Sequence, residues 1–242
     1  DLIGEAASYL DSWSYFSMAQ SSRHIYLSCN KPNHLQRLSP SLLIMNTLNR
    51  YKSITHLSLP LDSVHTLCKL QTLTNLTSIH IQCDGRLSNE LNRRGLECVC
   101  DQINTKNIHH LYVSNWAGSQ SFDWERDLLS KFESIKYLSL RDCFMRADNI
   151  SDCSIKLSNL EGLEFIFCGI QYQKMLHSVG NQLKYLKIDD EFEEEYIKDV
   201  DFKKLQQLIF FINHPRDPQL LAQIIKSCVT LQKIKIGTTQ EC

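Results

Sequence analysis

Cysteine and histidine residues are the first candidates for chemistry in this sequence. Cys98 and Cys100 flank Val99, and His109 and His110 follow shortly after. Zinc sites use these residue types, but their cysteines usually come in pairs separated by about two to four residues. No second cysteine pair lies near. We therefore interpret both cysteines as core side chains of a helix and expect no metal site.

Catalytic signatures are also missing from the sequence. Nine histidines and ten cysteines are present, but no local pattern places a nucleophile beside a base. No P-loop or G-x-G-x-x-G motif appears, and eight glycines leave few loops that could cradle a phosphate. We expect a protein that is not an enzyme, with no catalytic residues and no cofactor.

The ten cysteines are better explained by burial than by disulfides. Cys83, Cys143 and Cys168 each follow a short apolar run, where a small buried residue fits. No signal peptide is visible, and no apolar stretch reaches the roughly 18 residues that a membrane span needs. This favours a reducing compartment, the cytoplasm or nucleus. A formal net charge of -1 indicates neither nucleic-acid nor membrane partners.

An acidic run extends from Asp189 to Tyr196 and includes Phe192. It indicates either a patch for a basic partner or a solvated loop between structural elements, and the pattern favours the loop.

An aromatic-rich stretch contains Trp116, with Phe122 and Trp124 after it. Aromatic residues are enriched at interface hot spots, so Trp116 is a candidate contact residue. Trp116 or Trp124 could equally fill space between neighbouring elements.

The elements that position these residues follow from an internal repeat. One six-residue pattern recurs at intervals of 22 (54 to 76) to 32 (76 to 108) residues. It consists of an apolar residue, two variable residues, an apolar residue, one variable residue and an apolar residue. The pattern occurs at Ile54/Leu57/Leu59, Leu76/Ile79/Ile81, Ile108/Leu111/Val113, Ile135/Leu138/Leu140, Leu160/Leu163/Phe165, Leu183/Leu186/Ile188, Leu205/Leu208/Phe210 and Leu231/Ile234/Ile236.

The spacing within each unit predicts a short strand. The last two apolar residues are two apart, so they point to one face, and the residue between them points to the other. One unit cannot bury its apolar face alone, whereas stacked units bury a continuous core beneath parallel strands. Asn115, Cys143 and Cys168 fit the turn that leaves a strand.

Segments between the strands have helical spacing. One contains Val64, Leu67, Cys68 and Leu70, a second Leu91, Leu96, Val99 and Ile103, and a third Leu220, Leu221, Ile224, Ile225 and Cys228. Asp217-Pro218 is a good start for the third helix. The whole pattern over residues 54–236 resembles ribonuclease-inhibitor-like leucine-rich repeats. It implies an α/β solenoid, a horseshoe with parallel strands on its concave side, built from about eight repeats in residues 51–242.

If the concave face binds a ligand, the contacts come from the variable residue in the middle of each strand. These are Ser58, His80, Tyr112, Ser139, Glu164, Lys187, Ile209 and Lys235, with Trp116 added from the aromatic stretch. The set is mixed in charge and chemistry, as a protein ligand requires, and does not resemble a basic nucleic-acid groove.

Residues 1–50 lack the repeat, and their first part resembles an F-box. Residues 2–11 resemble its first helix, residues 14–19 its second, and the stretch Ser21-Ser22-Arg23-His24-Ile25-Tyr26-Leu27 its third. The usual opening Leu-Pro is absent, Ala6 stands where a larger aliphatic residue is usual, and the late tryptophan has no counterpart. The alternative is a plain helical cap that covers the end of the solenoid.

The resemblance to the F-box/leucine-rich-repeat family implies a function. The chain would be a substrate-recognition subunit of an SCF-type cullin-RING ubiquitin ligase. Its first residues would bind a Skp-type adaptor, and its repeats would hold an unknown protein substrate. Candidate adaptor contacts are Leu2, Ile3, Leu10 and Phe16. The alternative is a leucine-rich-repeat scaffold for protein–protein interaction that has no role in ubiquitin transfer.

Overall fold

The chain folds into two compact units, Asp1–Ile108 and His109–Cys242. The computed structural model describes residues 37–38, 55–60, 74–83, 95, 97–101, 103–115, 129–143, 157–168, 175–189, 200–212 and 217–238. The predicted division of the chain at residue 50 stays a prediction.

The part of the first unit that the structure describes has three parallel strands, β1 (Arg37–Leu38), β2 (His56–Pro60) and β3 (Ser78–Gln82). β1 pairs with β2, and β2 pairs with β3 along its full length. A short 3₁₀ helix, Thr105–Asn107, comes later, and residues 97–101 are helical. β1 was not expected, because its two residues lie in the segment that lacks the repeat.

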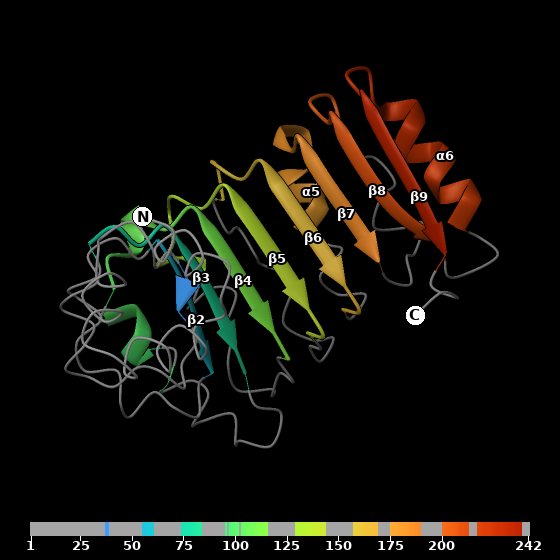
Figure 1. Ribbon diagram of the computed structural model, residues 1–242. Helices are drawn as coiled ribbons and strands as arrows, with labels where there is room; N and C mark the ends of the chain where they lie inside the picture. Colours follow the sequence, from blue (N-terminus) through green and yellow to red (C-terminus); the bar gives the residue numbers. More distant parts are fainter. Residues whose placement is uncertain are drawn as a thin grey trace, which may run out of the picture. The chain divides into compact units, whose positions relative to one another are not determined.

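In its described residues the second unit has six strands, all parallel, that pair in the order of the sequence (Figure 1). They are β4 (His110–Ser114), β5 (Tyr137–Arg141), β6 (Gly162–Ile166), β7 (Tyr185–Asp189), β8 (Gln207–Ile212) and β9 (Lys233–Thr238). The helices are α5 (Met175–Val179), the 3₁₀ helix Gly180–Gln182, and α6 (Asp217–Ser227). Both units are thus α/β in character with open, all-parallel sheets.

The structure has a strand at every one of the eight occurrences of the repeat. Each of β2 to β9 contains the last two apolar residues of one repeat. The register aligns equivalent residues, so that Leu111, Leu138, Leu163, Leu186, Leu208 and Ile234 form one line across the second unit. In β4 to β8 the apolar residues of the repeat are buried. Burying each such side chain contributes roughly 1.5–3 kcal/mol to the stability of the fold. These aligned apolar residues therefore form the core of the second unit.

Helix α6 confirms another prediction from the sequence. It begins at Asp217, where the Asp-Pro pair was expected to start it. Leu220, Leu221 and Ile224 are buried, and the helix packs against β8. The segment with Val64 and Leu67 lies outside the described residues. Among the helices in the described part of the chain, none has the length and apolar character needed to cross a bilayer.

The turns after β4, β5 and β6 share one backbone conformation. Asn115, Asp142 and Phe167 have φ values of 58°, 50° and 51°. Each amide donates a hydrogen bond to a carbonyl of the following strand, with N···O distances of 2.9 Å. Asn115 is therefore equivalent to Asp142 and not to Cys143. It is exposed, so the prediction that it shares the position of the buried cysteines is off by one residue.

A polar side chain just before four of the repeats bonds to the backbone of the preceding repeat. Its amide or hydroxyl donates to a carbonyl oxygen in the pairs Asn107 to Thr74, Asn159 to Glu133, Gln182 to Leu157 and Thr230 to Lys203. These bonds tie consecutive turns together where the chain enters each strand.

Candidate functional site

The faces of the sheets that point away from the core carry the predicted contact residues, and the register places these residues in rows. In the first unit, Ser58 pairs with His80. In the second unit, one row runs across six strands through Tyr112, Ser139, Glu164, Lys187, Ile209 and Lys235. We call this second set the middle row. The prediction that these side chains share one strand position is confirmed, and Trp116 lies outside the described residues.

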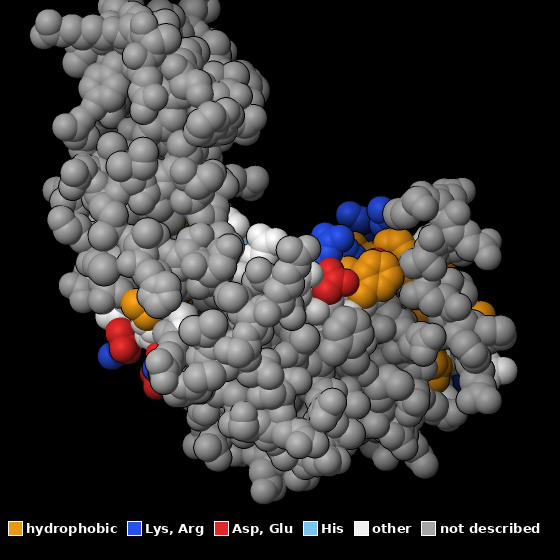
Figure 2. All heavy atoms as spheres, turned by 90° about the horizontal axis from the view of Figure 1, so that it is seen from below, with side chains coloured by type: hydrophobic (Ala, Val, Ile, Leu, Met, Phe, Trp, Pro, Cys, Tyr) orange, Lys and Arg blue, Asp and Glu red, His pale blue; other side chains and the backbone are white. Residues whose placement is uncertain are grey.

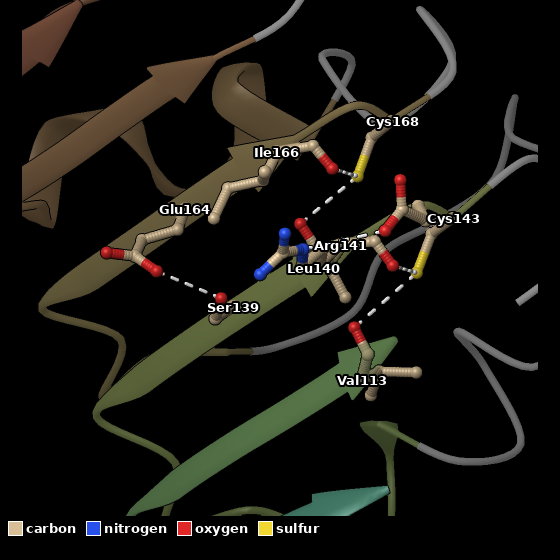
Figure 3. A network of polar contacts seen from close by, with 9 residues as sticks. Val113, Ser139, Leu140, Arg141, Cys143, Glu164, Ile166 and Cys168 are labelled. Carbon is tan, nitrogen blue, oxygen red and sulfur yellow. Dashed lines mark hydrogen bonds and ion pairs between the residues drawn. The ribbon is translucent and has the colours of Figure 1, made fainter. Parts of the chain in front are cut away.

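Glu164 is the centre of the hydrogen bonding in the middle row. Ser139 donates its hydroxyl to Oε2 of Glu164 at 2.9 Å, a contact visible in Figure 3. Tyr185 donates its hydroxyl to Oε1 at 2.8 Å. Both carboxylate oxygens therefore accept from neighbouring strands. Ser139 is only 6% exposed, so its prediction as an exposed contact is wrong: its hydroxyl serves to hold Glu164.

A group of aromatic rings lies beside Glu164. The ring of Tyr137 occupies the space above Gly162 on the next strand, because a Cβ atom there would lie 2.5 Å from Cδ2 of Tyr137. The Tyr137 ring reaches across β6 to Tyr185, with ring centroids 5.7 Å apart. On its other side it meets Tyr112 at 5.8 Å and His110 at 5.7 Å. We call these four rings the aromatic cluster.

The surroundings of Tyr137 and Tyr185 keep these two phenols protonated. Burial, together with hydrogen bonding to Glu164 and its charge, raises the pKa of Tyr137 far above its ordinary value. The same causes in the same order raise the pKa of Tyr185. Protonated phenols that donate to a carboxylate form a hydrogen-bonding surface, but they do not provide an activated nucleophile. The arrangement is suited to binding.

Sequence reasoning did not place Tyr137, Tyr185 or His110 on this face, and it considered His110 only as a zinc ligand. They occupy the first position of their strands, whereas only the middle position was considered. The available signal was Gly162, a residue without a side chain in a strand. Strand glycines often mark a place where another group approaches closely.

The other end of this face is basic and apolar. Nζ of Lys187 lies 5.9 Å from the centroid of the Phe211 ring, within the range of a cation–π contact. Phe211 covers Gly237 on β9 as Tyr137 covers Gly162. Lys233 and Lys235 follow on β9 and are exposed. Figure 2 shows Lys and Arg side chains gathered beside hydrophobic ones and an acidic group on the face in view.

In the first unit, Ser58 and His80 occupy the middle positions of β2 and β3, and histidine rings hydrogen-bond to neighbouring hydroxyl groups. Nδ1 of His80 lies 3.2 Å from the Ser58 hydroxyl, and Nδ1 of His56 lies 2.8 Å from that of Thr55. Ser58 and His80 are half-buried. The face of this sheet that points away from the core therefore carries the polar side chains of Ser58 and His80.

Cys143 and Cys168 have the structural role that the sequence predicted. Both are buried, and each thiol approaches carbonyl oxygens of its own strand and of the preceding one (Figure 3). The distance from Cys168 Sγ to the Leu140 oxygen is 3.2 Å, and that from Cys143 Sγ to the Val113 oxygen is 3.6 Å. Cys83 is also buried. The six cysteines in the described ranges are not joined in disulfide bonds.

The pair Cys98 and Cys100 sits on the helical stretch of the first unit, and Cys100 is buried. His109 places Nδ1 3.1 Å from the Ser134 carbonyl oxygen, and His110 belongs to the aromatic cluster. Among the residues described, no three potential ligands gather as a metal site would need.

Three predicted features lie where the structure gives no description. They are the adaptor contacts Leu2, Ile3, Leu10 and Phe16, the aromatic stretch with Trp116 and Trp124, and the acidic run after Asp189. Neither a comparison with protein-family models nor a search of curated proteins finds a significant match to this chain.

Proposed function

We propose that this chain is a non-catalytic leucine-rich-repeat solenoid that holds a protein ligand on the outer face of its parallel strands. The observation that carries the proposal is the middle row of the second unit together with the aromatic cluster. Six strands present side chains of different chemistry in a fixed register. Tyrosine and histidine rings and one lysine–phenylalanine contact lie among them.

Several features of this face favour a protein ligand. Tyrosines give large contact areas at a small cost in conformational entropy and are enriched in interface hot spots. Glu164 is fixed by two donors, so the ring positions are organised before a ligand arrives, which lowers the entropic cost of binding. The mixture of Glu164 with Lys187 and Lys235 gives a polar pattern that can select one protein surface.

The proposal is tested with variants of the aromatic cluster that should lose affinity for the ligand while remaining folded. A partner is identified by proximity labelling and then purified, and its affinity is measured by calorimetry. Tyr137→Ala with Tyr185→Ala should weaken binding by about 2 kcal/mol or more, the cost typical of hot-spot residues. The matched control is Lys131→Ala with Lys204→Ala, at exposed positions of the same unit outside its strands. Equal affinity of both variants would contradict the assignment of this face.

We propose further that the chain acts as a substrate-recognition subunit of an SCF-type ubiquitin ligase. The support is the F-box-like stretch in residues 2–27, placed before the repeats as in that family. The ligase role would be scaffolding: the adaptor is held by the N-terminal segment and the substrate by the repeats, and the rate increase comes from proximity.

The adaptor experiment separates this role from plain scaffolding. The chain is co-purified with a Skp-type adaptor, and Leu10→Asp with Phe16→Asp should abolish the association. The Tyr137→Ala, Tyr185→Ala variant is the matched control, because it should keep the adaptor and lose the ligand. Circular dichroism must show the same strand content in all variants. If folded wild type does not bind the adaptor, the chain is a scaffold without this role.

A further inference from the structure

The outer face of the second unit holds a carboxylate in place with neutral groups. Ser139 and Tyr185 each donate a hydroxyl to one oxygen of Glu164, at 2.9 Å and 2.8 Å. These donors position the carboxylate but supply no positive charge. A carboxylate offers about four acceptor sites, so Glu164 can still accept hydrogen bonds from a ligand.

The basic side chains on the strands beside Glu164 have other partners. Lys187 follows Glu164 in the middle row, yet its Nζ lies 5.9 Å from the centroid of the Phe211 ring on β8. Arg141 on β5 pairs with Asp142, with 3.5 Å between Nε and Oδ2. In the part of the second unit that the structure describes, no ion pair includes Glu164. A basic group of a ligand would therefore complement this carboxylate.

Tyr137 is the central ring of the aromatic cluster. It meets Tyr112, Tyr185 and His110 at centroid distances between 5.7 Å and 5.8 Å, with interplanar angles between 34° and 47°. The three tyrosines are half-buried and His110 is exposed, so part of this surface is open to a ligand. Rings tilted by such angles form a row along the face and do not enclose a point as the walls of a cage do. A row of this kind suits a flat group that stacks.

We propose that the aromatic cluster and Glu164 bind an arginine side chain of the protein ligand. A guanidinium group is flat and weakly hydrated, and it stacks on aromatic rings while its N–H groups donate to a carboxylate. The Tyr137 ring would contact the face of the guanidinium, and Glu164 would accept from its edge. This inference rests on the proposed function and names the chemistry that this face recognises in its ligand.

Other ligand groups use only part of this arrangement. The ammonium group of lysine is a compact, strongly hydrated charge without a flat face. A quaternary ammonium group is bound by cation–π contacts in aromatic cages, and it has no N–H group for Glu164. A nucleobase would stack on the rings, but the phosphate groups joined to it would be repelled by a carboxylate. A guanidinium group engages both the rings and the carboxylate.

The experiment titrates N-acetyl-arginine N-methylamide into the full chain, with isotope-labelled tyrosine rings observed by NMR. We expect saturable shifts of the Tyr137 and Tyr185 signals, which are assigned with the Tyr→Phe variant of each residue. The matched probe is N-acetyl-citrulline N-methylamide, which has nearly the same shape and no charge. It should bind at least about fivefold more weakly, because it lacks the cation–π contact and the charge-assisted hydrogen bonds.

Three further probes test the other ligand groups. They are N-acetyl-lysine N-methylamide, tetramethylammonium and uridine monophosphate. Each should bind at least about fivefold more weakly than the arginine probe, because each lacks either the flat cation or the N–H donors.

Variants locate the binding. Glu164→Gln keeps an acceptor for Ser139 and Tyr185 but removes the carboxylate, so the arginine and citrulline probes should bind it alike. The matched control, Glu133→Gln, removes an exposed carboxylate outside the strands and should keep the preference for arginine. Tyr137→Leu should weaken binding of the arginine probe about three- to fivefold, whereas Tyr137→Phe keeps the ring and should change it by less than about twofold. Circular dichroism checks that each variant is folded.

Four results would overturn the proposal. They are equal binding of the arginine and citrulline probes to the wild type, a preference for arginine that persists in Glu164→Gln, tighter binding of any of the other three probes, and no saturable shift with about 100 mM arginine probe, where binding contributes only roughly 1.4 kcal/mol. The proposed function is tested separately by the affinity of a purified partner. If Tyr137→Ala with Tyr185→Ala weakens that affinity and the arginine probe does not bind, the face binds a ligand through other chemistry.

Discussion

The ring of Tyr137 takes the place that a side chain at residue 162 would occupy. A Cβ atom on Gly162 would lie 2.5 Å from Cδ2 and 3.0 Å from Cε2 of Tyr137. The absence of a side chain on β6 therefore allows two tyrosines, on β5 and β7, to approach each other across it, with ring centroids 5.7 Å apart.

Gly162→Ala should displace the Tyr137 ring and destabilise the chain by about 1–3 kcal/mol, the usual cost of inserting an extra methyl group into a packed site. Urea denaturation measures this change. In a Tyr137→Ala background the same substitution should cost little or even stabilise, because alanine is better than glycine in a strand once the ring is gone. Additive effects of the two substitutions would show that the ring contact does not cause the cost.

The tyrosine cluster predicts a loss of stability at high pH. The folded-state pKa values of Tyr137 and Tyr185 lie above those of an unfolded chain, which are about 10. Above that pH the folded chain binds more protons than the unfolded chain, so the free energy of unfolding falls as pH rises. Below pH 10 this contribution is fully present. Urea denaturation at pH 8 and pH 10.5 tests it, and Tyr137→Phe should show a smaller fall than wild type.

Asn159 offers a test of the polar contacts that join successive repeats. Its side-chain amide donates to the Glu133 carbonyl oxygen at 3.1 Å. Asn159→Ala should lower the free energy of unfolding by about 1 kcal/mol, the net value of such a bond. Asn181→Ala, at an exposed position of the same unit, is the control and should change stability by less than about 0.5 kcal/mol. Equal effects of the two substitutions would contradict a linking role for Asn159.

The described cysteines should differ sharply in reactivity. Burial raises the pKa of the Cys83 thiol well above its ordinary value, and Cys143 and Cys168 are buried with their thiols directed at carbonyl oxygens. Iodoacetamide at pH 8 should modify these three more slowly than the half-exposed Cys98 by a factor on the order of ten or more. Mass spectrometry of the digested protein gives the rates. In urea all four should react alike, and fast native labelling of Cys168 would show that it is accessible.

The strands and their register could be predicted from the sequence because one repeated physical requirement determines both. Residues two apart must point to the same face, and equivalent residues must align for the core to be continuous. The middle row followed from the same rule. The burial of Ser139 did not, because it depends on a hydrogen bond to Glu164 on the next strand, and no pattern within one repeat contains that information.

Other features depend on neighbours in space. The aromatic cluster, for example, depends on which strands lie beside Gly162. The turn after each strand was predicted as a place for Asn or Cys. The structure separates two positions there: the left-handed residue, such as Asp142, and the buried cysteine that follows it.

The sequential pairing of parallel strands has a consequence for how this protein could change. In the described residues of the second unit, the strands that follow one another in the chain pair with each other. Gain or loss of one whole repeat would therefore leave the register of the remaining strands intact. Such a change would lengthen or shorten the outer face by one strand, so the size of the ligand could vary in discrete steps while the core lines stay unbroken.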